Sequence, residues 1–395
     1  KKIGDTVYGI GWLPLGGYVK IAGMIDESMD KEQMEKPPQP WEFRSKPTWQ
    51  RLIIMLGGVF VNFVLALIIY ILASFAYGDS DISVSSIKDG YWIENKLLTD
   101  LGLQTGDKVL TINDTKIIND SDIRANIIGA NTITVLRNGT EKTVTLPEDF
   151  LGQLSSSKNT SLFQLRIPFL VRAIIDSSAN KSVDIKPRDI ITSINGKELK
   201  YFDQTKDILN GLKGETVQVN VLRDKETFTR SLKVDKNGKI GIAPAFDEER
   251  FAELGYFNVI TKEYSFGESF GVGYKKFTGQ ITSYFAQLKL IFTPSTGAYK
   301  GVGGFRAIFK IFPNTWSWQA FWGITAFLSI MLGVLNLLPI PALDGGHVMF
   351  LLYEMVSGKK PGDKFMEYAQ MVGFIILMAL VLFANGNDIF KWITE

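Results

Sequence analysis

Three long stretches of the chain carry no charged side chain. Leu52 to Tyr77 is uncharged over 26 residues, and Ala320 to Leu343 is uncharged over 24. Tyr368 to Asn387 is a weaker third stretch, because its strongly apolar part is only Val372 to Ala384. A helix that crosses a membrane needs about 20 predominantly apolar residues. The pattern therefore predicts three membrane-spanning helices, which we place at 51–78, 318–357 and 366–386.

Between the first two predicted spans the composition is that of a soluble protein, and it contains an internal repeat. Leu103 to Asp114 recurs as Ile185 to Gly196, at an offset of 82 residues. Each copy combines an Asp-containing turn, an alternating strand and an Asn-led turn, followed by a polar helix and a hairpin. This order favours two PDZ-like domains, at 79–150 and 160–246, that bind peptide termini along an exposed edge strand. Two generic small β domains are the alternative.

Shorter segments complete the expected architecture. Residues 1–25 alternate β-rich pieces with glycine and predict a membrane-associated β-hairpin, and residues 26–50 predict a charged cytoplasmic loop. Between 262 and 296, apolar residues recur at helical spacing, which predicts an amphipathic helix on the membrane surface. Packing of that helix on a PDZ-like domain is an equal alternative. We expect a mixed α and β membrane protein with three transmembrane helices, two PDZ-like β-rich domains and a small membrane-associated β-hairpin.

Charge restricts the partners and the orientation. The formal net charge is +2, and no basic patch interleaved with aromatic residues points to nucleic acid. The chain has no cysteine, which excludes disulfides and thiolate metal sites. Lysine and arginine gather before the first and last predicted spans, a pattern typical of cytoplasmic ends. These basic residues are Arg44, Lys46, Arg51, Lys359, Lys360 and Lys364. The middle region is therefore expected on the opposite side of the lipid bilayer.

One carboxylate, that of Asp344, lies at a position where burying a charge in the membrane is energetically unfavourable. Asp344 directly follows the uncharged stretch that ends at Leu343, and an aspartate near the centre of a membrane helix costs about 2.5–3.5 kcal/mol on insertion scales. Pro339 and Pro341 remove backbone donors and should break the helix just before it. Broken backbone at membrane depth is tolerated only where it is buried in protein or lines a wet cavity. The sequence thus predicts an intramembrane pocket with an anionic ligand at its wall.

Four features occur along the chain in a recognisable order. They are Gly-Trp-Leu-Pro-Leu-Gly-Gly-Tyr-Val-Lys at 11–20, a Gly-x-x-x-Asn helix at 58–62, the tandem PDZ-like domains and Asn-x-x-Pro-x-Pro-x-Leu-Asp-Gly-Gly-His at 336–347. This series resembles the site-2 protease family, most closely its bacterial RseP type. The resemblance implies an intramembrane zinc metalloprotease of the bacterial inner membrane, with the PDZ-like domains on the periplasmic side. Its substrates would be single-span membrane proteins such as anti-sigma factors or remnant signal peptides.

The resemblance also assigns roles to individual residues. In the family, Zn2+ is held by two histidines of an HExxH helix and by the aspartate that corresponds to Asp344. Asn336, with Pro339 and Pro341, would hold the substrate backbone near the metal. The hairpin would receive the unwound substrate as an added strand at Tyr18, Val19 and Lys20. A purely structural role remains the alternative for Asn336 and for Asp344.

The sequence departs from the family in one respect. Its single histidine is His347, so no HExxH occurs in these 395 residues. We therefore expect a fragment that begins after the first membrane helix, with its catalytic histidines and glutamate outside it, and that is inactive as it stands. His347 shares a helix face with Asp344, and a structural, hydrogen-bonded role is favoured over metal binding.

Two other function classes compete with the protease. A non-catalytic, membrane-anchored PDZ adaptor would recruit envelope proteins without chemistry, but it would have no use for a carboxylate inside the bilayer. A transporter with a cation-binding aspartate on a broken helix is the third hypothesis. The prediction of only three spans, with no sign of a second membrane half, disfavours the transporter.

Overall fold

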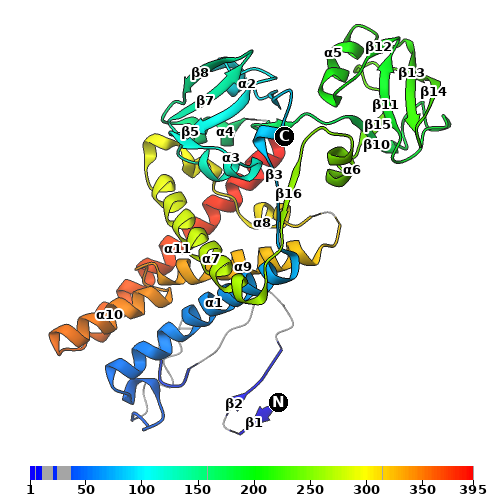
Figure 1. Cartoon of the computed structure of the whole chain (residues 1–395). Coiled ribbons are helices and arrows are strands. Elements are labelled where there is room, and N and C mark those ends of the chain that lie inside the picture. Colours follow the sequence, from blue (N-terminus) through cyan, green and yellow to red (C-terminus); the bar gives the residue numbers. More distant parts are fainter. Residues whose placement is uncertain (5, 11–20, 25–36, 158, 314, 395) are drawn as a thin grey trace. The chain divides into compact units, whose positions relative to one another are not determined.

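The computed structural model describes residues 1–4, 6–10, 21–24, 37–157, 159–313 and 315–394 (Figure 1). It divides into two compact units. The helical unit comprises Lys1–Ala73, Phe270–Thr282 and Gly303–Ile393, and the β-rich unit comprises Ser74–Ser269, Ser283–Val302 and Thr394–Glu395. Each unit has its own internal packing.

Three helices of the described residues are long and apolar enough to cross a membrane. They are α1 (Thr48–Tyr77), α9 (Trp318–Leu337) and α11 (Asp363–Thr394). The structure thus has the three long apolar helices that the sequence predicts, and the mixed α and β character of the chain is confirmed. Many apolar side chains of α11 are exposed. An apolar surface of this extent is unfavourable in contact with water, which agrees with a helix that faces lipid.

Close contacts hold α1 and α9 together inside the helical unit. A Cβ added at Gly333 of α9 would lie 3.0 Å from the ring of Phe63 on α1. Small residues at such a contact let two membrane helices approach closely. The side chain of Ser317 caps α9 by accepting a hydrogen bond from the backbone N–H of Ala320 at 3.3 Å. The helical unit also contains α8 (Phe305–Ile311), α10 (Asp344–Ser357) and a short hairpin of β1 (Lys2–Ile3) and β2 (Thr6–Val7).

The helix predicted between 262 and 296 is α7 (Phe266–Ile291). The Ser265 side chain and the Glu268 carboxylate form a capping box at its start. Its middle packs on α1, because a Cβ at Gly273 would come within 2.7 Å of the backbone of Ile71, and the rings of Phe277 and Phe63 meet edge to face at 6.2 Å. A location of α7 on the membrane surface stays a prediction.

The β-rich unit contains two sheets that carry the repeat. The first has the order β6-β5-β7-β8, beside a separate pair of β4 and β9. Its buried core also draws on residues 162–167, which follow the predicted boundary at 150. The elements are β4 (Tyr91–Trp92), α2 (Lys96–Asp100), β5 (Lys108–Ile112), β6 (Thr115–Lys116), α3 (Asp120–Asn126), β7 (Thr132–Arg137), β8 (Thr140–Thr145), α4 (Phe150–Ser156) and β9 (Gln164–Leu165).

The second sheet has the order β14-β13-β11-β10-β15, with β12 paired to β11. Its elements are β10 (Phe169–Ile174), β11 (Ile190–Ile194), β12 (Lys197–Glu198), α5 (Thr205–Asn210), β13 (Thr216–Arg223), β14 (Glu226–Lys233) and β15 (Ile242–Pro244). The chain then forms α6 (Glu248–Glu253) and β16 (Val259–Lys262), and β16 pairs with β3 (Asp79–Ile82). Short 3-10 helices are η1 (Phe43–Ser45), η2 (Val84–Ser86), η3 (Phe202–Gln204), η4 (Pro294–Thr296) and η5 (Ala298–Gly301).

The repeated aspartate forms the same ion pair with an arginine in both copies. The buried Asp107 carboxylate accepts hydrogen bonds from Nε and Nη2 of Arg137, both at 2.6 Å. Asp189 accepts the same two bonds from Arg223, both at 2.7 Å. Each pair joins the turn before one strand to the end of the strand beside it. The sequence repeat therefore corresponds to a repeated structure, while the PDZ-like identity of the two copies stays a prediction.

Candidate functional site

The long apolar stretch is broken just before its carboxylate. Helix α9 ends at Leu337 and α10 begins at Asp344, and residues 338–343 form a non-helical turn, which we call the proline turn. Inside it, Ile340 N–H donates to Leu338 O at 2.7 Å and Leu343 N–H donates to Ile340 O at 3.0 Å. The structure therefore has the break where the two prolines lead us to expect it.

The proline turn contains a strained residue. Ala342 has φ +90°, which a residue with a side chain rarely adopts. Backbone strain of this kind costs about 1–3 kcal/mol and persists only where the surroundings enforce it. Neighbouring contacts must therefore hold the turn in place.

Glycines on two helices, α10 and α11, provide those contacts. A Cβ at Gly346 would lie 2.6 Å from both Ile340 O and the Cα of Pro341, and a Cβ at Gly345 would lie 2.6 Å from Leu337 O. A Cβ at Gly373 of α11 would overlap the carbonyl oxygen of Pro341. Because glycine has no Cβ, the start of α10 and the middle of α11 can both approach the turn closely. The turn is thus packed between α10 and α11.

Asp344 is the first residue of α10 and is half-buried. A carboxylate at a helix N-terminus is favoured by the helix dipole, typically by about 0.3–1 kcal/mol. His347, Leu351 and Glu354 follow at intervals of three or four residues, so they share its face of the helix. The imidazole of His347 lies 3.4 Å from the side-chain amide of Gln370 on α11, measured between the two Nε2 atoms. Since an amide nitrogen only donates, His347 Nε2 is the acceptor.

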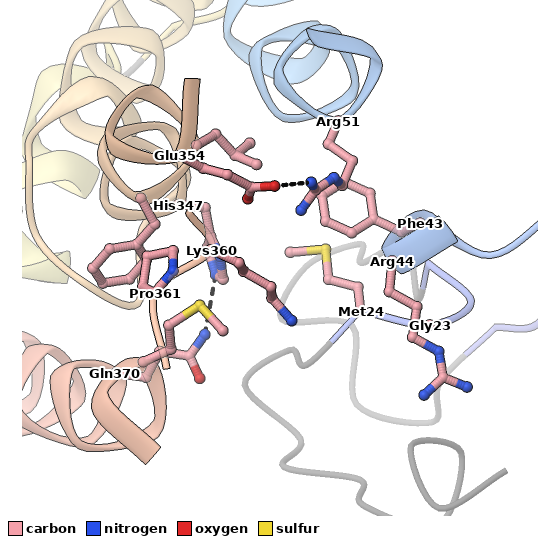
Figure 2. Close-up of a pocket in the computed structure, with 13 residues that line it drawn as sticks. Gly23, Met24, Phe43, Arg44, Arg51, His347, Glu354, Lys360, Pro361 and Gln370 are labelled. Carbon is pink, nitrogen blue, oxygen red and sulfur yellow. Dashed lines mark hydrogen bonds and ion pairs between the residues drawn. The ribbon is translucent and has the colours of Figure 1, made fainter. Parts of the chain in front are cut away.

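This face of α10 borders a cavity of about 70 Å³ (Figure 2). At one side of the cavity the Glu354 carboxylate accepts hydrogen bonds from Arg51 Nη2 at 2.6 Å and from Thr48 Oγ1 at 3.0 Å. The Arg51 and Glu354 side chains are only 10% and 16% exposed. Arg51 also donates from Nε to the backbone carbonyl of Lys46 at 2.9 Å. The pair therefore ties the end of α10 to the start of α1.

The other predicted site residues fall into two groups. Asn336 is half-buried in the last turn of α9, Pro339 is exposed and Pro341 is half-buried, so all three lie on or beside the proline turn. The side-chain amide of Asn336 makes no hydrogen bond with any described residue, which leaves it available to a bound molecule. The remaining predicted residues lie outside the described part of the chain; they are Tyr18, Val19 and Lys20.

A complete zinc centre is not present in the part of the chain that the structure describes. A catalytic zinc site uses three protein ligands and leaves one position open. Among the described residues no three His, Cys, Asp or Glu side chains gather as such a site. On this face of α10, Asp344 is the residue that the family resemblance assigns to zinc, while His347 bonds to Gln370 and Glu354 pairs with Arg51. The described residues therefore fit one ligand of a zinc site and not the whole of it.

Sequence reasoning missed two elements of this site. Gly373 lies in an apolar run, where a glycine alone gives no sign of a neighbour. The sequence marks Arg51 only as a basic residue near a membrane end, because its partner Glu354 lies 303 residues away. An acidic residue within the apolar positions of α10 was the one available signal for that ion pair.

A second cavity, of about 280 Å³, lies in the first repeat copy. It is lined by α3, including Asp120 and Arg124, and by residues 160–164, which lead into β9. Among the described residues β9 pairs only with β4, so its other edge is open. An open strand edge beside a helix is an arrangement that can take up an extended peptide.

Comparison with known proteins gives a consistent result. The family model described as peptidase family M50 matches residues 1–380. A protein of Neisseria meningitidis provisionally named zinc metalloprotease NMA0084 is 24% identical over 423 residues, which cover 98% of this chain and 89% of that protein. The regulator of sigma E protease of Haemophilus influenzae is 26% identical over 425 residues, which cover 98% of this chain and 87% of that protein. With the three apolar helices, these relatives indicate a membrane protein.

Proposed function

Because the chain belongs to peptidase family M50, a zinc-dependent family, we propose that it acts as an intramembrane metalloprotease of the RseP type. The reaction is hydrolysis of a peptide bond within the transmembrane segment of a single-span substrate. The observation that carries this proposal is the position of Asp344, which follows an apolar helix and a break stabilised by close glycine contacts. A carboxylate in such a place is expected to have a function.

In this proposal Asp344 is one of three protein ligands of Zn2+. When bound, zinc lowers the pKa of a coordinated water and polarises a carbonyl oxygen. The two histidine ligands and the general base of an HExxH helix are not among these 395 residues, whose single histidine is His347. With these 395 residues alone, we propose that zinc is held weakly and that no peptide bond is hydrolysed.

The residues around the proline turn would bind substrate. A substrate helix must unwind before its backbone is accessible, because helical N–H and C=O groups are already paired. The amide of Asn336, which has no hydrogen-bond partner among the described residues, is suited to bind such an exposed backbone. Pro339 and Pro341 keep the adjoining backbone out of a helix. We propose that Tyr18, Val19 and Lys20, which lie outside the described residues, bind the other part of the unwound segment.

The β-rich unit would act as a peptide sensor or size filter. The cavity between α3 and residues 160–164 is a suitable place for a peptide terminus. Basic residues before and at the starts of α1 and α11 favour a cytoplasmic location for those two starts. The β-rich unit would then lie in the periplasm of a bacterial inner-membrane protein. Anti-sigma factors and remnant signal peptides are the substrate classes that we propose.

A second candidate function is a membrane-anchored PDZ adaptor without chemistry. The observation in its favour is that the described residues hold no cluster of three metal-binding side chains. The adaptor would need the peptide cavity of the β-rich unit and would have no need of Asp344.

An assay of cleavage in cells separates the two functions. The protein as its gene encodes it, here called the gene product, would be expressed with a tagged single-span model substrate whose apolar helix contains a Gly-Pro pair. The protease proposal predicts that Asp344→Asn abolishes cleavage while the amount of protein in the membrane stays normal. Asp114→Asn, in an exposed turn of the β-rich unit, serves as the matched control and should cleave normally. Cleavage by Asp344→Asn at the unmutated rate would reject the ligand role.

A further inference from the structure

We propose that Gly373 of α11 is a positioning residue that fixes the direction of the Asp344 carboxylate. This inference rests on the function proposed above and extends it to a helix that carries no motif residue of the family resemblance. Gly373 lies in the third apolar helix, 29 residues after Asp344.

The first argument is the closeness of the two backbones. A Cβ at Gly373 would overlap the carbonyl oxygen of Pro341 and would lie 3.0 Å from the Cα of that proline. Non-bonded atoms normally keep about 3.5 Å or more apart. A single methyl group at 373 would therefore force α11 and the proline turn to separate by more than about 1 Å.

The second argument is that a second helix, α10, also approaches the proline turn closely and limits how far the turn can shift. Gly346 of α10 also faces the turn, since a Cβ there would stand 2.6 Å from both Ile340 O and the Cα of Pro341. The backbone of the turn is already strained at Ala342. Interiors packed in this way transmit displacements instead of absorbing them. Since Asp344 is three residues after Pro341, it would move with the turn.

The third argument is that α11 contacts the same face of α10 at a second point. Gln370 and Gly373 are three residues apart, so they lie on one face of α11. Gln370 contacts His347, which shares the face of α10 that presents Asp344. Helix α11 therefore supports the carboxylate at the turn before it and again one helical turn after it.

A matched control exists on the same helix. A Cβ at Gly386 of α11 meets nothing within 4 Å. Replacing either glycine by alanine has the same effect on helix propensity, so Gly373→Ala and Gly386→Ala differ only in what the added methyl group meets.

The experiment measures kcat and KM of the purified gene product on the tagged model substrate with the Gly-Pro pair. A misplacement of about 1 Å costs on the order of 100-fold in rate. We expect Gly373→Ala to lower kcat by about that factor and to change KM less than about threefold, while Gly386→Ala keeps both values. Gly346→Ala, which introduces a methyl group against the same turn from α10, should also lower kcat.

Three outcomes would overturn the inference. One is a kcat for Gly373→Ala within about threefold of the unmutated value. Another is an equal loss of kcat in Gly386→Ala. The third is failure of both Gly373→Ala and Gly346→Ala to accumulate as folded protein, which would make the contact structural only. Asp344→Asn is measured in parallel. If Asp344→Asn retains cleavage, the proposed function itself is wrong; if only Asp344→Asn is inactive, the proposed function stands and the positioning role is wrong.

Discussion

Replacement of Asp107 by asparagine should destabilise the first repeat copy far more than an ordinary surface change. The Asp107 side chain has no exposed surface and accepts two hydrogen bonds from Arg137 at 2.6 Å. It also accepts one from the backbone N–H of Gln104 at 2.9 Å. Asparagine keeps the size but loses the charge, so Arg137, only 14% exposed, is left without its counter-ion. Removing one partner of a buried ion pair typically costs about 3–5 kcal/mol.

The assay is hydrogen–deuterium exchange of the gene product, read at the amides of β5 and β7. A loss of 3 kcal/mol corresponds to roughly 100-fold faster exchange for amides that exchange when the copy unfolds. Asp100→Asn is the control, because the Asp100 and Lys96 side chains that form its ion pair are 59% and 85% exposed. Exposed pairs of this kind contribute only about 0.3–0.5 kcal/mol to stability. Asp189→Asn should weaken the second copy in the same way, with a smaller effect since Arg223 is 24% exposed. Equal exchange in Asp107→Asn and Asp100→Asn would refute this reasoning.

Two further predictions concern ion pairs in the two units. Glu354→Gln should destabilise the helical unit by about 3 kcal/mol, since it leaves the mostly buried Arg51 without its counter-ion. The measurement is the free energy of unfolding in detergent. A double variant that exchanges the two charges should recover part of the loss. In the β-rich unit, hydrogen bonds from Lys200 and then Tyr201 hold the pKa of Asp89 below its ordinary value of 3.8. Its stabilising contribution is therefore full above pH 3.8 and is lost as the pH falls through the lowered pKa. Thermal melting in acid should show this loss in the unmutated protein, and an identical acid profile in Asp89→Asn would contradict it.

The sequence was most informative where a strong local rule applied. Charge-free stretches predicted α1, α9 and α11, because no other common structure tolerates 20 or more such residues. Pro339 and Pro341 predicted the break before Asp344, since proline cannot continue a helix. The recurring aspartate predicted a repeated turn, and Asp107 and Asp189 have matching partners.

Features that depend on contacts between distant segments could not be predicted. Helix α11 covers Asp363–Thr394, beyond the predicted 366–386, because charged residues at the ends of a membrane helix can remain helical in water. Nothing in the sequence shows that Gly373 meets Pro341, since a glycine in an apolar helix has the same appearance whether or not another backbone approaches it. Likewise, the partner of Arg51 follows only from the packing of α10 against α1.

The central claim is that Asp344 helps to hold a zinc ion inside the membrane. Its most direct test is the zinc content of the purified gene product, measured by elemental mass spectrometry. The control is Asp388→Asn, whose buried carboxylate caps α8 by accepting from Gly304 N–H at 2.9 Å. We expect about one zinc ion per chain in the unmutated protein and in Asp388→Asn, and less than roughly a tenth of that in Asp344→Asn. An Asp344→Asn protein that is folded and keeps the full zinc content would contradict the account.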